Sequence, residues 1–261
     1  QKKNGDLNAA IQNYRLAIEF NPDSLEAHNN LGSALKLQGK LDASLAIFRK
    51  AIEIGPNSSE IYFNFANTLS ETGDLEGAIG AYQKALDINP DYAKAHLNLG
   101  FTLLNDGNFK AGWCGYEARL KTPQFTPVKL ITKKPKWNTT DKGRVLLNSE
   151  QGVGDMIMFS SMIPEIQNLC DKIIVQLDER LLPLFKRSFS NKISFYSREV
   201  LIPESQYDTH ISMGSCAQYL RPNLESFKRS SGPFLTANKK LSARLRSQIL
   251  RESDKIIYGL T

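Results

Sequence analysis

The chain has 261 residues, of which 41% are hydrophobic and 23% charged, and its formal net charge at pH 7 is +6. This length allows two domains with separate cores, and the composition, without a membrane span or a secretory leader, leads us to expect a cytoplasmic protein. The three cysteines, Cys114, Cys170 and Cys216, lie far apart and form no metal-binding motif, so the sequence predicts no metal site.

Charge is divided unevenly along the chain. Residues 1–120 carry 11 Lys and Arg against 14 Asp and Glu, whereas residues 121–261 carry 22 against 13. The basic excess begins in a lysine-rich stretch with three prolines at 121–143, which we interpret as an irregular connector. No basic motif interleaved with aromatic residues accompanies the excess, so the sequence does not favour nucleic-acid binding.

Internal repeats dominate residues 1–120. Several residue types recur at intervals of 34 residues: Gly5, Gly39, Gly73 and Gly107; Pro22, Pro56 and Pro90; Ala17, Ala51 and Ala85; and Tyr14, Phe48, Tyr82 and Tyr116. This is the period and pattern of the tetratricopeptide repeat (TPR), a helix pair that buries its apolar face only by stacking on its neighbours. We therefore predict a TPR α-solenoid, made of a partial first repeat and about three further repeats. The register places Gln1 late in a helix, so we expect further residues before it.

Asparagines recur on the predicted first helix of each repeat, the helix that lines the concave face. They are Asn30, Asn64 and Asn98. An amide side chain both donates and accepts hydrogen bonds, so a ladder of three can hold the backbone of an extended protein or peptide partner. The alternative is that asparagine at this position only supports the turn between neighbouring helices. The sequence leaves both interpretations open.

The last repeat departs from the pattern. Gly112 stands where the other repeats have alanine or serine, and Arg119 stands where an earlier repeat has Ala85. Together with Trp113 and Tyr116, these residues predict a larger and stickier surface. We expect this repeat to dock onto the domain that follows.

Residues 144–254 alternate apolar runs with helical patterns, which predicts a parallel α/β domain. Strands are expected at 144–149, 172–177, 192–196 and near 208–212, and helices at 155–169, at 179–189, from about 215 and at 239–251. Residues 255–261 resemble the first strand of a further domain that the chain does not complete. The predicted fold class is thus α plus α/β.

The loop after the first expected strand carries the candidate site residues of this domain. Glu150, Gln151, Gly152 and Gly154 precede or flank the expected start of the helix, and Asp155 is the expected N-cap. Glycines allow a ligand to approach the backbone, and a helix amino end offers N–H groups to an anion or a sugar. The loop lacks a P-loop ending and matches a dinucleotide fingerprint only at its two glycines, so a tight turn without a ligand is an open alternative.

Five sequence blocks occur in a characteristic order: GWCGYEARL, PKW at 135–137, LLNSEQGVGDMIMFSSMIPEI, LDERLLPLFKRSF at 177–189 and MGSCAQYLRPNLESF at 213–227. Their order resembles that of bacterial TPR-containing glycosyltransferase-like proteins, which are similar to O-GlcNAc transferase and, more distantly, to the heptosyltransferases. The resemblance implies a GT-B architecture, in which two Rossmann-like domains face a cleft and the TPRs present an acceptor. Residues 144–254 would then be the amino-terminal, acceptor-side domain, and residues 255–261 the start of the donor-side domain.

The resemblance also implies roles for single residues. Asp155 matches the aspartate regarded as the candidate base that deprotonates the acceptor hydroxyl, although a helix cap alone would also account for it. Glu150 and Gln151 would position the acceptor, and Arg180 would bind an anionic ligand unless it is only solvated. No bound cofactor or metal is implied, and the donor would be a nucleotide sugar.

Two functions therefore follow from the sequence. In the first, the chain is a fragment of a glycosyltransferase-like protein that moves a sugar from a nucleotide sugar to a hydroxyl, and it is inactive without the donor-side domain. In the alternative, it is a non-catalytic TPR scaffold that mediates protein–protein interaction, and its α/β domain has lost any chemistry.

Overall fold

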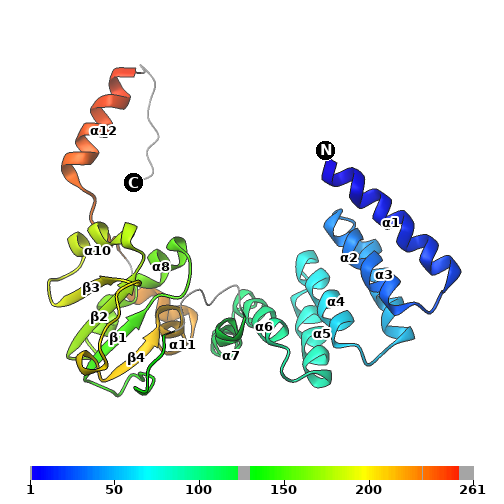
Figure 1. Cartoon of the computed structure of the whole chain (residues 1–261), viewed down its shortest axis with the longest axis horizontal. Helices are drawn as coiled ribbons and strands as arrows, with labels where there is room; N and C mark the ends of the chain where they lie inside the picture. Colours follow the sequence, from blue (N-terminus) through cyan, green and yellow to red (C-terminus); the bar gives the residue numbers. More distant parts are fainter. Residues whose placement is uncertain (1, 123–129, 231, 253–261) are drawn as a thin grey trace. The chain divides into compact units, whose positions relative to one another are not determined.

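The computed structural model describes residues 2–122, 130–230 and 232–252 of the chain. Their contacts divide the chain into two compact units (Figure 1). The repeat unit comprises Gln1–Thr126 with Arg221–Ser226, and the α/β unit comprises Pro127–Leu220 with Phe227–Thr261. The predicted strand at 255–261 lies outside the described residues.

The repeat unit is a stack of antiparallel helices (Figure 1). A first helix, α1 (Lys2–Phe20), is followed by three pairs: α2 (Leu25–Leu37) with α3 (Leu41–Ile54), α4 (Ser59–Thr72) with α5 (Leu75–Ile88), and α6 (Ala93–Asn105) with α7 (Phe109–Tyr116). The first helices of the pairs begin at Leu25, Ser59 and Ala93, which are 34 residues apart. The predicted α-solenoid is therefore confirmed.

The recurring glycines and prolines end the helices as expected. Gly39, Gly73 and Gly107 have φ of +79°, +86° and +84°, a left-handed conformation that ends the first helix of each pair at low cost only in glycine. The second helices, α3 and α5, end two residues before Pro56 and Pro90. Gly5 is different, because α1 continues through it.

Small residues allow the two helices of a pair to approach closely. A Cβ atom at Gly32 would lie 2.7 Å from the Phe48 ring, and one at Gly100 would lie 2.6 Å from the backbone nitrogen of Tyr116. Real Cβ atoms do not come that close, so a side chain at Gly100 would push α6 and α7 apart. Phe48 is fully buried, as expected for the aromatic residue that fills the space between repeats.

The large side chains of the last repeat are buried and do not form the exposed surface that the sequence predicts. Arg119 is fully buried, and Trp113 and Tyr116 are nearly so. The 3-10 helix η1 (Glu117–Lys121) follows α7 directly, and within it the Arg119 guanidinium lies 4.2 Å from the centroid of the Tyr116 ring. Trp113 Nε1 donates a hydrogen bond of 2.8 Å to the carbonyl oxygen of Arg221, which belongs to the same unit. The expected docking of this repeat onto the domain that follows stays a prediction.

The α/β unit is built on a parallel sheet with the strand order β3-β2-β1-β4. The strands are β1 (Arg144–Asn148), β2 (Lys172–Leu177), β3 (Ile193–Ser197) and β4 (Thr209–Ser212), close to the predicted ranges. Val145, Leu146 and Leu147 of the central strand β1 are fully buried, which accounts for its continuous apolar sequence.

Helices in the middle of this unit are shorter or more divided than the sequence predicts, whereas α12 (Lys239–Glu252) matches the helix expected at 239–251. The single helix expected at 155–169 is two helices, α8 (Val153–Ser160) and α9 (Ile163–Gln167). Pro164 lies in the first turn of α9 and has no N–H to continue a helix from the preceding turn, which explains the break. The remaining helices are η3 (Glu179–Leu181), α10 (Leu182–Ser188), η4 (Glu204–Gln206), η5 (Met213–Cys216), α11 (Ala217–Leu220), η6 (Leu224–Ser230) and α12 (Lys239–Glu252).

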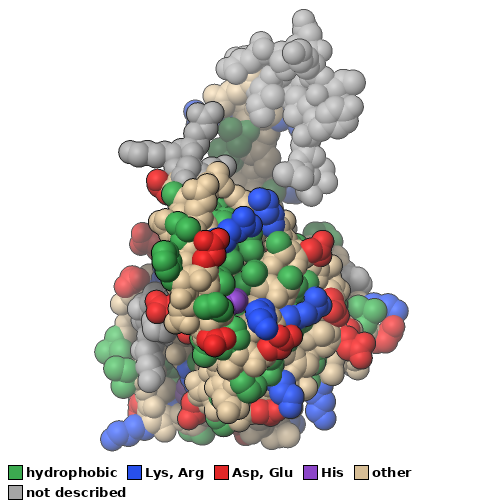
Figure 2. Space-filling view, turned by 90° about the vertical axis from the view of Figure 1, so that its right-hand side faces the viewer, with side chains coloured by type: hydrophobic (Ala, Val, Ile, Leu, Met, Phe, Trp, Pro, Cys, Tyr) green, Lys and Arg blue, Asp and Glu red, His purple; other side chains and the backbone are tan. Residues whose placement is uncertain are grey.

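The surface shown in Figure 2 mixes side chains of opposite charge. Lys and Arg side chains alternate with Asp and Glu, and hydrophobic side chains lie singly among them. This face therefore presents no extended field of one sign. In the parts of the chain that the structure describes, no helix is long and apolar enough to cross a membrane.

Replacing Gly100 with alanine is expected to destabilise the repeat unit by about 1–3 kcal/mol, because the new methyl group overlaps the backbone of α7. The measurement is the midpoint of urea unfolding followed by helical circular dichroism. Gly80 of α5 provides the matched control: a Cβ there meets nothing within 4 Å, so Gly80→Ala should be about 0.5–1 kcal/mol more stable than the parent. A Gly100→Ala variant as stable as the parent would show that the helices of this pair do not need their close approach.

Candidate functional site

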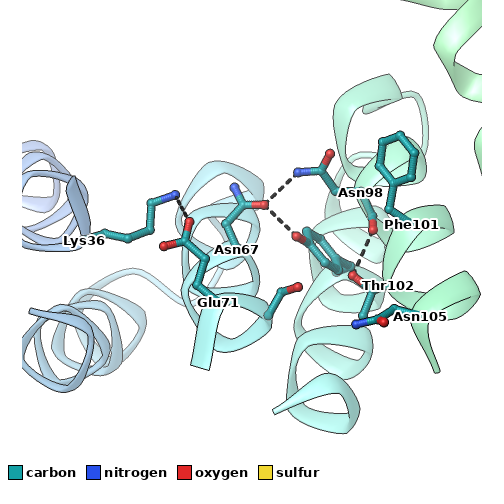
Figure 3. Close-up of a pocket in the computed structure, with 9 residues that line it drawn as sticks. Lys36, Asn67, Glu71, Asn98, Phe101, Thr102 and Asn105 are labelled. Carbon is teal, nitrogen blue, oxygen red and sulfur yellow. Dashed lines mark hydrogen bonds and ion pairs between the residues drawn. The ribbon is translucent and has the colours of Figure 1, made fainter. Parts of the chain in front are cut away.

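A cavity of about 470 Å³ opens on the repeat unit and is lined mainly by α4 and α6 (Figure 3). We call it the groove. Its lining residues are Lys36 from α2, Asn67, Ser70 and Glu71 from α4, Tyr82 from α5, and Asn98, Phe101, Thr102 and Asn105 from α6. Most of them carry amide or hydroxyl groups, so the groove is suited to hydrogen bonding with an uncharged polar partner.

Asn67 is the centre of the hydrogen bonds in the groove. Its Oδ1 accepts from Asn98 Nδ2 at 2.7 Å and from Tyr82 Oη at 2.6 Å. Burial raises the pKa of Tyr82 to about 12, so its hydroxyl stays protonated and able to donate at neutral pH. The bond to Asn67 holds the Asn98 amide in place, and no hydrogen bond from the described residues reaches Asn98 Oδ1, which can accept one from a ligand.

An ion pair crosses from the second repeat to the third at the side of the groove. Lys36 Nζ lies 2.9 Å from Glu71 Oε1 (Figure 3). Both side chains are partly exposed, so the pair contributes little to stability. Its effect on the groove is electrostatic: these two opposite charges are the charged groups of the lining, which is therefore neutral overall.

The three predicted asparagines do not have the same surroundings. Asn98 lines the groove. Asn64 donates from Nδ2 to Asn29 Oδ1 at 2.8 Å and so joins α4 to α2. For Asn30, the described part of the chain gives no side-chain hydrogen bond. The asparagines at 64 and 98 thus connect the first helices of adjacent repeats, rather than the turn between helices, while each retains further hydrogen-bonding capacity.

Three groups that shape the groove were not predicted, because none of them recurs in every repeat. Asn67 aligns with Ser33 and Phe101 in the neighbouring repeats, so a search for periodic residues passes over it. Glu71 likewise has no counterpart at 34 residues, and Lys36 has one only at Lys2. The signal that identifies Asn67 and Glu71 is helical spacing: they follow Asn64 by three and seven residues and so share its face of α4.

In the α/β unit, the loop from Glu150 to Asp155 follows β1 at the carboxyl edge of the sheet. Glu150 is buried and its Oε1 accepts from Gln151 Nε2 at 3.0 Å. The predicted N-cap role of Asp155 is wrong: Gly152 is the N-cap, in an extended conformation, and Asp155 lies in the first turn of α8. A Cβ atom at Gly152 would lie 3.5 Å from Asp155 Oδ2, whereas one at Gly154 would meet nothing within 4 Å.

Arg180 lies after β2 and is paired with a carboxylate. Its Nε and Nη2 donate to the two oxygens of Asp178 at 2.8 and 2.9 Å. These hydrogen bonds lower the pKa of Asp178 to about 2, and Arg198 adds a longer contact of 3.3 Å. The contacts described for Arg180 thus join it to Asp178 rather than to Asp155. Its guanidinium remains largely exposed, with a side-chain exposure of 71%.

The described ranges 2–122, 130–230 and 232–252 contain no group of three or more His, Cys, Asp or Glu side chains that could hold a metal ion.

Known proteins resemble the chain in its first half. Tetratricopeptide-repeat family models match residues 2–39 and 66–107, residues 25–58 and residues 47–80. Protein FlbA of Caulobacter vibrioides is 25% identical over 156 residues, which cover 53% of this chain and 26% of FlbA. The chain thus spans about a quarter of that relative.

Two solved structures illustrate the similarity. A crystal structure of MamA is 24% identical, covers 48% of this chain and 73% of its own, and gives a TM-score of 0.44. A tetratricopeptide repeat protein from Parabacteroides merdae ATCC 43184 is 23% identical, covers 48% and 50%, and gives a TM-score of 0.42. None of the proteins and families named here is described as a glycosyltransferase. The family models together match residues 2–107 over the helix pairs described above, so this part of the chain is a tetratricopeptide-repeat array.

Proposed function

We propose that the repeat unit is a scaffold that binds an extended, uncharged segment of a partner protein in the groove. The observation that carries this proposal is the fixed amide of Asn98 within a neutral cavity of about 470 Å³. An extended backbone presents N–H and C=O groups, and a side-chain amide pairs with both. This backbone pairing by itself does not depend on the side chains of the partner.

Hydrogen bonds within the groove hold its lining side chains in place before a partner arrives, which favours binding. Asn98 is held by Asn67, and Thr102 Oγ1 donates to the carbonyl oxygen of Asn98 at 2.9 Å. Side chains that are ordered before binding lose little conformational freedom when a ligand arrives. Asn105 and Ser70 extend the polar lining along α6 and α4.

The groove also sets a preference for the side chains of the partner. Phe101 is 44% exposed, and its ring offers an apolar contact beside the amides. Lys36 and Glu71 neutralise each other, so neither a basic nor an acidic segment gains a net attraction. We therefore expect a neutral segment with an apolar residue that packs on Phe101.

Selection from a random peptide library displayed on phage tests this proposal. The peptides recovered on the native protein should bind Asn98→Ala roughly tenfold more weakly, because the variant loses hydrogen bonds to the peptide backbone. Asn13→Ala is the matched control, since Asn13 is exposed on α1 and lies outside the groove lining. Peptides that bind the Asn98→Ala variant as well as the parent would place the interaction elsewhere.

A second candidate function rests on the α/β unit. We infer that this unit is the acceptor-side half of a glycosyltransferase-like protein, with Asp155 as the base and Glu150 and Gln151 positioning the acceptor. Strand order β3-β2-β1-β4 supports this inference, because it matches the first four strands of a doubly wound, Rossmann-like sheet. In such sheets ligands bind outside the carboxyl ends of the strands, where the order reverses.

The candidate residues of this second function follow β1, the strand at which the strand order of the sheet reverses. Strands β1 and β4 are neighbours on either side of this reversal, and Asn148 pairs in register with Ser212 at their carboxyl ends. Glu150 and Asp155 follow β1 directly. A nucleotide sugar would be the donor substrate, and the site that holds it would have to come from residues other than those described.

Sugar transfer by the protein at its natural length tests the second candidate. Asp155→Asn should lower transfer to a hydroxyl acceptor by about 10²–10⁴-fold, the usual contribution of a general base, and should leave the melting temperature nearly unchanged because Gly152 is the N-cap. Asp171→Asn is the control, since Asp171 is exposed at the amino end of β2. If no nucleotide sugar in a broad panel supports transfer by the unmodified protein, only the scaffold function remains.

A further inference from the structure

The helix α12 (Lys239–Glu252) begins at a capping residue of its own. Asn238 precedes it, and the Oδ1 atom of Asn238 accepts a hydrogen bond of 3.1 Å from the backbone N–H of Leu241, as an N-cap does. The 14 residues of the helix make about four turns and a rod of about 21 Å. The helix thus has a defined start and a surface whose sides can be compared.

No side chain of α12 is buried where the structure describes it. Every residue from 239 to 248 is exposed, including Leu241 at 51% and Leu245 at 47%. These two leucines and position 249, an isoleucine, stand four residues apart and so share one side of the helix, which we call the leucine stripe. A helix of a folded domain normally buries such a stripe against its core. Here nothing in the described part of the α/β unit covers it.

Basic residues flank the leucine stripe on both sides. Successive residues of a helix are about 100° apart around its axis. Lys240 and Arg244 each precede a leucine and lie on one flank, whereas Arg246 follows a leucine and lies on the other. In all, α12 carries five Lys or Arg residues against one Glu. The surface that complements it must therefore be negative on both sides of an apolar strip.

The segment before α12 attaches the helix to the α/β unit. Thr236 lies two residues before the N-cap, and its carbonyl oxygen accepts a hydrogen bond of 2.7 Å from Arg187 Nε. Its backbone N–H donates to Ser188 Oγ at 2.8 Å. Arg187 and Ser188 both belong to α10, so a surface that binds α12 is held beside the α/β unit.

We propose that α12 lies on the surface of an anionic lipid bilayer, with the leucine stripe in the acyl region and the basic flanks among the lipid phosphates. Interfacial helices have this composition, with a low overall hydrophobicity, one apolar side and a Lys- and Arg-rich remainder. Their long basic side chains reach the headgroups while the apolar residues enter the bilayer. The proposal is independent of both functions proposed above.

The arrangement of charge favours a bilayer over other partners. A second copy of α12 would bring five basic residues against five, which repel one another. Nucleic acid would pair with the basic flanks but would leave the leucine stripe in water. A layer of lipid phosphates meets both flanks at once, and the acyl chains beneath it take up the stripe.

Flotation of the whole chain with lipid vesicles tests the proposal. Vesicles made of equal parts of phosphatidylglycerol and phosphatidylcholine should bind the protein, and vesicles of phosphatidylcholine alone should not, because a short apolar stripe needs the electrostatic attraction. The triple variant Lys240→Gln, Arg244→Gln and Arg246→Gln should bind the anionic vesicles roughly a hundredfold more weakly. Its melting temperature should match that of the parent, since all three side chains are exposed.

Two further variants separate the helix from the net charge and the stripe from the flanks. The matched control is Lys50→Gln, Lys84→Gln and Lys110→Gln, which removes three exposed lysines from the repeat unit and should bind as the parent does. Leu241→Ser with Leu245→Ser keeps every charge and should weaken binding roughly tenfold or more, because the apolar contact is lost.

Three results would overturn the proposal. Equal binding to both kinds of vesicle, or binding to neither, would show that no anionic bilayer is recognised. A loss in the lysine control as large as that in the α12 triple variant would assign the effect to net charge. Full binding by the leucine variant would show that α12 responds to charge alone, as a nucleic acid or an acidic protein would require.

Discussion

The repeat unit depends on how closely the two helices of each pair approach. Gly32, Ala66 and Gly100 stand at the same position of successive repeats, where there is room for one methyl group at most. With this spacing fixed, each pair stacks on the next at the same angle, and the same face of α2, α4 and α6 recurs along one side. The groove is a product of that repetition, because residues on different helices meet there only if the helices remain in register.

The hydrogen bonds between first helices then give the groove its chemistry. Asn64 bonds to Asn29, and Asn98 bonds to Asn67, so the amides join adjacent repeats, and Asn98 lines the groove at the same time. Structural support and partner binding, which the sequence presents as alternatives, are therefore compatible uses of one side chain. An amide has more hydrogen-bonding positions than a single contact consumes.

In the α/β unit, a different constraint collects the polar groups at one edge. The apolar residues of β1 are buried on both faces of the sheet, and polar side chains first appear where the strand ends, at Asn148, Ser149 and Glu150. Because the strands are parallel, the ends of β2, β3 and β4 lie at the same edge. The position of the loop that begins at Glu150 is a consequence of this arrangement.

Periodic features of the fold were predictable, and features that occur once were not. The 34-residue period gave the helix pairs, and apolar runs gave the four strands, because each rests on many residues that agree. The break at Pro164, the burial of Arg119 and the N-cap at Gly152 each depend on a single local contact. Of the groove residues, Asn98 was found from the sequence because it recurs, and Asn67 was not, because Ser33 and Phe101 stand at its position in the neighbouring repeats.

The most direct test of the central claim is site-specific photocrosslinking from the groove. A photoreactive phenylalanine analogue at Phe101 should crosslink in the source cells to one extended segment of a partner protein, located by mass spectrometry. The same analogue at Gln83, which is exposed on α5 outside the groove lining, should not crosslink to that segment. Crosslinks from Gln83 to the same segment, or none from Phe101, would contradict the account.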